Sequence, residues 1–246
     1  MTRTTRMFCV VQLLANALLL WLAYEWLALS ESTPLRLLWS AVAALSILAL
    51  ASWLHGATFA SFREDAKPGV GAAFRTALGH LVPLVLMVLA AIAIYGILAW
   101  WAGHSAAPAA KLASWLTLKF RKPVRPATVL RVFNVVLWIV CWLFLPAEIL
   151  LPVFSGVAAR GWHGFNEFGW RRHTHFYRLE VPLLALCALW LPFRLVDWVP
   201  RVSGFTLETI SFGVRTLAAY LLFVSAAMLL AYLTSRGKPA GRLAAE

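Results

Sequence analysis

The sequence predicts an all-α, polytopic membrane protein: a bundle of about six transmembrane helices with two interfacial amphipathic helices. Of its 246 residues, 62% are apolar and only 13% are charged, about half the charged share of an ordinary soluble domain. Several apolar runs also reach the roughly 20 residues with which a helix crosses a hydrocarbon core of about 30 Å. Because no soluble fold of this length could bury so many apolar side chains, a lipid-facing surface has to cover the excess.

Six apolar runs are predicted as spans, numbered here in chain order: 7–28, 35–60, 80–102, 129–155, 179–198 and 212–234. The third span is the cleanest, with no charged residue from Leu81 to Gly103. The fifth is the shortest and contains Pro182, Pro192, Arg194 and Asp197. We still predict it to cross, because membrane helices tolerate proline where neighbouring groups satisfy the freed carbonyls.

Two stretches between the spans have the period of amphipathic helices. In 68–80 the apolar positions at helical spacing are Val70, Phe74, Ala77 and Leu81. In 108–122 one apolar face is formed by Leu112, Trp115, Leu116 and Phe120. We predict that both helices lie in the plane of the lipid headgroups. The alternative is that each is a solvated loop with chance periodicity.

The chain reads as one transmembrane domain over 1–234, followed by a short disordered polar tail over 235–246. The first run is predicted to be an uncleaved span, because it is long and lacks a small-x-small cleavage site before a polar segment. Six spans place both termini on one side, which we predict to be the cytoplasmic side of a bacterial-type inner membrane. The positive-inside rule supports this orientation only weakly, since basic residues divide almost evenly between the two sides.

A basic cluster with aromatic neighbours follows the third span, and it consists of Lys111, Trp115, Lys119, Arg121, Lys122 and Arg125. Six spans place it on the side opposite the termini. Two explanations fit: the cluster binds a partner protein or anionic lipid headgroups there, or the topology differs. The formal charge of +12 is explained by basic residues at span ends, and no nucleic-acid-binding module is visible.

Charged side chains inside spans are costly and therefore candidates for function. Glu148 follows Pro146 in the fourth span, and it predicts either a proton or cation site or a protonated carboxyl in an interhelical hydrogen bond. Arg194 is expected to pair with Asp197, one helical turn away. Gln12 and Asn16, one turn apart in the first span, are predicted to hold helices together.

Spans four and five share a pattern, C-x-L-x-L-P followed by P-x-x-S-G, which begins at Cys141 and at Cys187. Consecutive spans run in opposite directions, so a true repeat would be inverted, as in many transporters. The alternative is that leucine-rich membrane sequence matches itself by chance.

Metal binding has only weak candidates, which are His163, His173 and His175 in the loop after span four. Two imidazoles could meet there, but basic and aromatic neighbours are typical of a loop at the headgroups. His55 is predicted to be a packed polar residue rather than a haem ligand. No sequence motif implies a cofactor, a phosphate cradle or a serine nucleophile.

These observations favour an integral membrane accessory or scaffolding subunit that binds partner membrane proteins or lipids and has no catalytic activity of its own. The basis is few charges inside the spans, 13 tryptophans and two amphipathic helices with basic flanks. The alternative is a small transporter or channel that uses the proline-containing spans four and five with Glu148. A membrane enzyme acting on lipid comes third, with the loop histidines as its candidate site.

Overall fold

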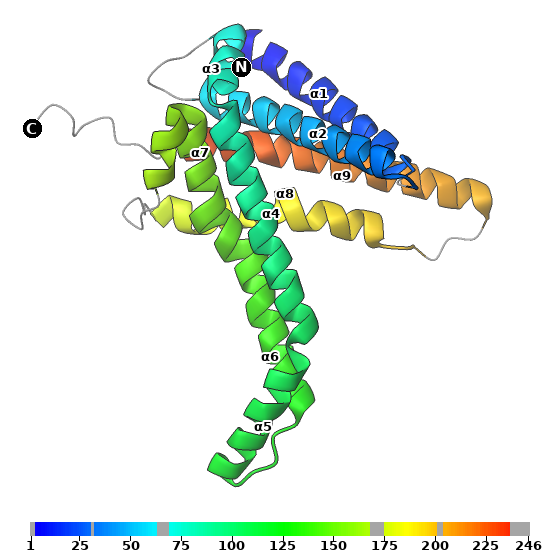
Figure 1. Ribbon diagram of the computed structural model, residues 1–246, viewed down its shortest axis with the longest axis vertical. Helices are drawn as coiled ribbons and strands as arrows, with labels where there is room; N and C mark the ends of the chain where they lie inside the picture. The colour runs from blue at the N-terminus through cyan, green and yellow to red at the C-terminus, as the bar shows by residue number, and fades with distance from the viewer. Residues whose placement is uncertain (1–2, 31, 63–68, 168–174, 201–203, 237–246) are drawn as a thin grey trace, which may run out of the picture.

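The computed structural model describes residues 3–30, 32–62, 69–167, 175–200 and 204–236, and every regular element in these ranges is a helix. Four helices form a bundle: α1 (Arg3–Leu27), α2 (Pro34–Ser61), α8 (His175–Asp197) and α9 (Phe205–Arg236). Helix α9 contacts the other three, and α1 also contacts α2. Helix α4 (Leu81–His104) crosses the bundle steeply and continues beyond it (Figure 1). The fold is therefore helical throughout the described residues, as predicted.

Five helices in the described part of the chain are long and apolar enough to cross a membrane: Met7–Leu27, Pro34–Ser61, Leu81–His104, Pro126–Asn166 and Phe205–Thr234. They coincide with predicted spans one to four and six. The chain is thus a multi-pass helical membrane protein. The residues that face outward along these helices are mostly large and apolar, which suits contact with lipid.

The predicted fifth span is also a helix, but it does not belong to these five. Helix α8 has 23 residues, with Pro182 and Pro192 inside it. Its described part carries three charged residues, Glu180, Arg194 and Asp197. Its small residues Ala185 and Ala188 are buried, and α8 packs along α9. A crossing by α8 remains a prediction.

The hairpin between α1 and α2 is fixed by residues at the helix ends. The Thr33 side chain caps α2 by accepting a hydrogen bond from the Arg36 backbone N–H at 3.3 Å, and Pro34 takes the first helical position. On the other side of the turn, Trp26 Nε1 donates to the Ser40 backbone oxygen and to its hydroxyl, both at 3.0 Å. Polar groups near the turn are thereby paired across the two helices.

The fourth span is a continuous helical rod with a widened middle. It comprises α6 (Pro126–Ile139), the π-helix η1 (Val140–Leu150) and α7 (Leu151–Arg160), and the 3₁₀ turn η2 (Gly161–Glu167) follows its end. Pro146 lies inside η1, where proline lacks an N–H to donate. The Leu151 N–H bonds to the Pro146 oxygen five residues back. The helix around Pro146 therefore has the wider π-type hydrogen bonding, from residue i to residue i+5.

The two predicted amphipathic stretches are helices, α3 (Val70–Gly79) and α5 (Ala106–Phe120). In α3 the Phe74 ring contacts Trp53 at 5.3 Å between centroids, but the most buried positions are Ala73 and Ala77. Helix α3 thus packs on α2 through its alanines. Its position relative to the headgroups remains a prediction.

Helix α5 packs on α6 through a side other than the predicted apolar face, and the contact of that face with the headgroups remains a prediction. Its buried residues are Ala109 and Ala113, which pack with Val129 of α6, whereas Trp115 and Phe120 are 52% and 62% exposed. The reason is close approach: alanine lets α5 lie directly on α6, and the larger apolar residues then point outward. The exposed side of α5 therefore mixes apolar and basic side chains.

The core lies where α2, α4, α7 and α9 meet, around the fully buried Leu84 and Val157. A polar cluster also lies between α1 and α2. There Gln12 Nε2 donates to Thr58 Oγ1 at 2.6 Å, and Asn16 Nδ2 donates to the Gln12 backbone oxygen at 2.8 Å. These contacts confirm the prediction that Gln12 joins two helices. Asn16 does so only indirectly, because its hydrogen bonds go to Gln12 on its own helix.

Candidate functional site

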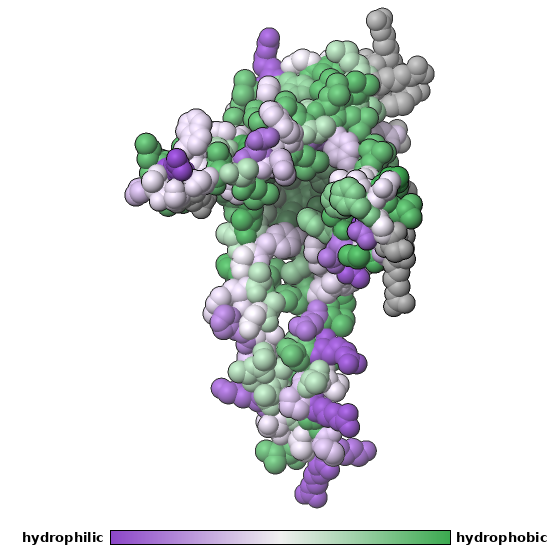
Figure 2. All heavy atoms as spheres, turned by 90° about the vertical axis from the view of Figure 1, so that its right-hand side faces the viewer, coloured by the Kyte–Doolittle hydropathy of each residue, from purple (hydrophilic) through white to green (hydrophobic). Residues whose placement is uncertain are grey.

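A cavity of about 260 Å³ opens between α2, α4, α7, α8 and α9. Its walls are almost entirely apolar, and the polar residues among those that line it are Ser52 and His55. Figure 2 shows a hollow with a hydrophobic surface on one face of the molecule, above the arm. Concave apolar sites with a small number of polar groups are typical of sites that bind small molecules.

The two polar residues of the cavity come from the same helix. Ser52 and His55 lie three positions apart on α2, so both side chains fall on one face. Ser52 is 3% exposed, and its hydroxyl oxygen has no hydrogen-bond partner among the described residues. The half-buried His55 ring packs edge-on against Phe223 of α9, with 6.1 Å between centroids. The cavity is therefore a candidate binding site.

The sequence pattern did not predict this cavity. His55 is a packed residue, as expected, whereas Ser52 is not among the predicted site residues. A signal was present, because Ser52 and His55 are polar residues at helical spacing inside an otherwise apolar span. The other walls come from segments far apart in the sequence, and their residues include Phe154 on α7 and Phe223 on α9.

The second candidate site lies at the end of the arm, a name used here for residues 92–139, which project from the bundle as the second half of α4, α5 and α6 (Figure 1). The predicted basic cluster gathers there, and we call it the basic tip: Lys111, Trp115, Lys119, Arg121, Lys122 and Arg125. All six residues are exposed. Figure 2 shows hydrophilic side chains concentrated near this end. The sequence contains no acidic residue from 66 to 147, so nothing in the arm neutralises them.

The backbone of the basic tip is held in one shape. Arg121 ends α5 in the left-handed conformation, with φ of 54°, which is uncommon for a residue other than glycine. The Val124 N–H then donates to Thr117 Oγ1 at 3.0 Å, and Pro126 begins α6. On the exposed side, Lys119 Nζ lies 4.7 Å from the centre of the Trp115 ring. The cationic groups are thus carried by an ordered turn.

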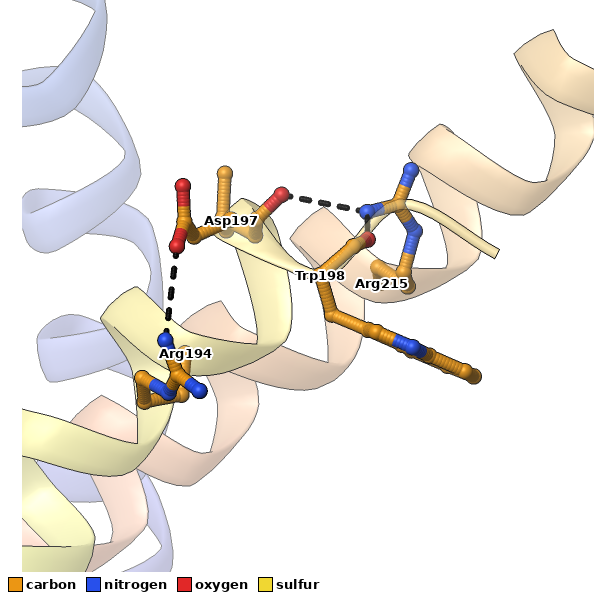
Figure 3. A network of polar contacts seen from close by, with 5 residues as sticks. Arg194, Asp197, Trp198 and Arg215 are labelled. Carbon is orange, nitrogen blue, oxygen red and sulfur yellow. Dashed lines mark hydrogen bonds and ion pairs between the residues drawn. The ribbon is translucent and has the colours of Figure 1, made fainter. Parts of the chain in front are cut away.

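The predicted pair on α8 is present, and it lies at a helix end. Arg194 Nη1 is 3.5 Å from Asp197 Oδ2, and the two side chains are 61% and 78% exposed. Figure 3 shows how Arg215 reaches the same helix end from α9. Its guanidinium donates to the backbone oxygens of Val196, at 3.1 Å, and Trp198. A cation at the carboxyl end of a helix also complements the helix dipole.

These contacts give Arg215 and Arg194 different structural roles. We expect Arg215→Met to speed amide hydrogen exchange in the last turn of α8 about tenfold, because the half-buried guanidinium no longer binds its carbonyls. Arg194→Gln is the matched control and should change exchange less than about twofold, since exposed ion pairs contribute little. Equal effects of the two variants, measured by mass spectrometry, would contradict this assignment.

Of the remaining predicted residues, the structure describes Glu148 and His163. Glu148 is half-buried in η1, and His163 is exposed in η2. His173 and the side chain of His175 lie outside the described residues. Within the described residues, no group of three or more His, Cys, Asp or Glu could hold a metal ion. The structure therefore offers two candidate sites, the cavity and the basic tip, and neither contains a set of reactive side chains.

No protein-family model matches this chain, and neither a curated protein nor a solved structure matches it.

Proposed function

We propose that this protein is an accessory or scaffolding subunit of a membrane complex, one that binds partner membrane proteins or lipids and catalyses no reaction itself. The observation that carries this proposal is the arm. It projects from the bundle, presents apolar side chains along its length and ends in the basic tip. A projection of this kind offers a surface on which a partner protein or lipid can bind, away from the protein's own core.

The sides of the arm support a partner or lipid that covers them. On α4, Ile97 and Trp100 are 65% and 62% exposed, and on α6 the exposed residues include Val132 and Val136, at 55% and 54%. Large apolar patches with a polar border mark interaction surfaces or lipid contact. Because α6 packs mainly on α5 and touches α4 only slightly, the outward faces of α4 and α6 need another apolar surface.

The basic tip supports an acidic partner surface or anionic lipid headgroups as the ligand. Each Lys or Arg near an anionic membrane surface contributes roughly 1 kcal/mol of attraction. Trp115 adds an aromatic ring of the type that settles at the membrane–water interface. Exposed cations beside an exposed tryptophan thus match the chemistry of headgroups.

For localisation we propose a bacterial-type inner membrane with both termini in the cytoplasm. The arrangement of the bundle supports termini on one side, since α1 begins and α9 ends at the same end of the bundle (Figure 1). In this topology α8 crosses the membrane as the fifth of six spans. The inner membrane and the cytoplasmic side are inferred from the sequence alone.

The test is extraction of the native protein in mild detergent, followed by native mass spectrometry of the intact particle. We expect a partner protein or anionic lipid in fixed ratio to the chain. Lys111→Gln, Lys119→Gln and Lys122→Gln combined should weaken its retention by about two orders of magnitude, at roughly 1 kcal/mol per charge. The matched control removes three exposed cations elsewhere, in Arg36→Gln, Arg75→Gln and Arg194→Gln, and should retain the ligand.

A particle that contains only this chain, without bound lipid, would contradict the proposal. That result would favour the alternative, a small transporter or channel that uses the fourth span with α8. The observation that supports the alternative is the π-helix at Pro146, because such segments occur often at functional sites. Loss of transport in Glu148→Gln would then identify the carboxyl as part of the pathway.

A further inference from the structure

We propose that the cavity between α2, α4, α7, α8 and α9 binds one neutral, membrane-soluble molecule, with an apolar ring that carries a carbonyl or hydroxyl oxygen. Ser52 and His55 supply the hydrogen bonds to that oxygen. This inference goes beyond the proposed function, because it concerns a small molecule and not the partners of the arm. Binding is all that it includes; no bond is made or broken.

The first reason is the unpaired hydroxyl of Ser52. A buried polar group without a hydrogen bond lowers stability, and the cost is higher in a span, where no bulk water can compensate. Serine in a helix can bond to the carbonyl four residues back, as Ser46 does to Val42 at 2.8 Å. Ser52 makes no such bond within the described residues, so its buried hydroxyl still lacks a partner, which the oxygen of a ligand in the cavity would supply.

The second reason is the chemistry of the walls. None of the residues that line the cavity is Lys, Arg, Asp or Glu, so a charged headgroup would lack a counter-charge inside it. Phe59, Phe154 and Phe223 converge on the cavity from α2, α7 and α9. Aromatic side chains prefer edge-to-face or offset contacts with another ring. A neutral ring therefore fits better than an ion.

The third reason is size. The volume of about 260 Å³ lies above the roughly 150 Å³ of an engineered cavity that binds benzene, and just below the 300 Å³ at which drug-sized pockets begin. One substituted ring occupies that space, and an attached tail can leave through the open side into lipid. Water is a poor occupant, because an ordered water needs two to four polar partners and the walls are otherwise apolar.

The experiment uses the full chain, purified in a neutral detergent and washed free of lipid. Three probes with the same tail distinguish the chemistries: a decyl-substituted benzoquinone, 1-decanol and decane. Binding is titrated by native mass spectrometry, and thermal unfolding is followed in parallel. We expect the quinone to bind one molecule per chain and to bind at least tenfold more tightly than decane, with the alcohol in between.

Two substitutions test the assigned residues. Ser52→Ala should weaken quinone binding about two- to tenfold, the value of one hydrogen bond, and should not destabilise the free protein, because the lost hydroxyl has no partner. His55→Phe keeps an aromatic ring beside Phe223 and should have a similar effect. The double variant should bind the quinone no better than decane.

Matched controls are Ser46→Ala on the same helix and His104→Phe at the exposed end of α4, and both should bind the quinone like the wild type. Filling the cavity with Ala188→Phe should abolish binding of all three probes. The proposal is overturned if quinone and decane bind the wild type equally, or if the Ser52 and His55 variants bind like the controls. Because Ser52→Ala is a conservative change, these tests do not depend on whether the filled variant folds.

Discussion

Replacing Gly164 by alanine is expected to lower the free energy of unfolding by about 3 kcal/mol or more. Gly164 lies in η2, where this 3₁₀ turn folds back on α7. A Cβ atom added there would overlap the backbone of Gly156 and Val157, which cannot move aside as a flexible side chain can. Overpacking of this kind costs about 1–3 kcal/mol and occasionally more, because backbone has to shift.

The control for this substitution is Gly96→Ala in the middle of α4, where the added methyl group meets no atom within 4 Å. It should stabilise the protein by about 0.5–1 kcal/mol, because glycine loses more backbone entropy in a helix than alanine does. Unfolding by sodium dodecyl sulfate, followed by circular dichroism, measures both. Equal stability of Gly164→Ala and the wild type would mean that η2 does not pack backbone-to-backbone on α7.

Gln12→Ala should cost about 2–3 kcal/mol, the second largest effect we expect. Gln12 is 1% exposed and donates to Thr58 Oγ1 at 2.6 Å across the α1–α2 contact. Truncation removes this interhelical bond and leaves a cavity, and large-to-small changes at fully buried sites carry both costs. The same unfolding assay applies.

Gln12→Leu separates packing from hydrogen bonding. It keeps most of the volume, and the Thr58 hydroxyl still donates to the Leu54 oxygen at 2.9 Å. Its expected cost is about 0.6–1.7 kcal/mol, from the average to the largest value measured for interhelical hydrogen bonds in a membrane protein. If Gln12→Ala cost no more than Gln12→Leu, the buried volume of Gln12 would not contribute to helix packing.

The helices could be predicted well because their signal is local. An apolar run such as Leu81–Gly103 has to be a helix in lipid, since only a helix pairs its backbone groups within one segment. The α5 contact could not be predicted in the same way. The hydropathy of Ala109 and Ala113 does not distinguish their side of α5 from the other sides. Their small size nevertheless decides which side of α5 lies on α6. Sequence periodicity indicated the apolar face with Trp115, which is exposed, and gave no indication of the side that packs on α6.

The two candidate sites also differ in how local their sequence signal is. The basic tip is a continuous stretch of sequence, so its position at one exposed turn could be predicted from Lys119 to Arg125. The cavity depends on five helices that meet in space, and only the Ser52–His55 spacing on α2 was visible beforehand. Arg215 was missed for a similar reason, because its acceptors lie at the end of another helix.

The steep crossing of the arm and the bundle has a consequence for the surrounding bilayer. Two sets of helices that cross steeply cannot both stand along one membrane normal. Helix α4, with 24 residues, is about 36 Å long, and α9, with 32, is about 48 Å, so both exceed a hydrocarbon layer of about 30 Å. This excess length lets α4 and α9 each traverse the layer while leaning in different directions. Lipids beside such a protein meet inclined walls, and their acyl chains tilt or shorten to match them.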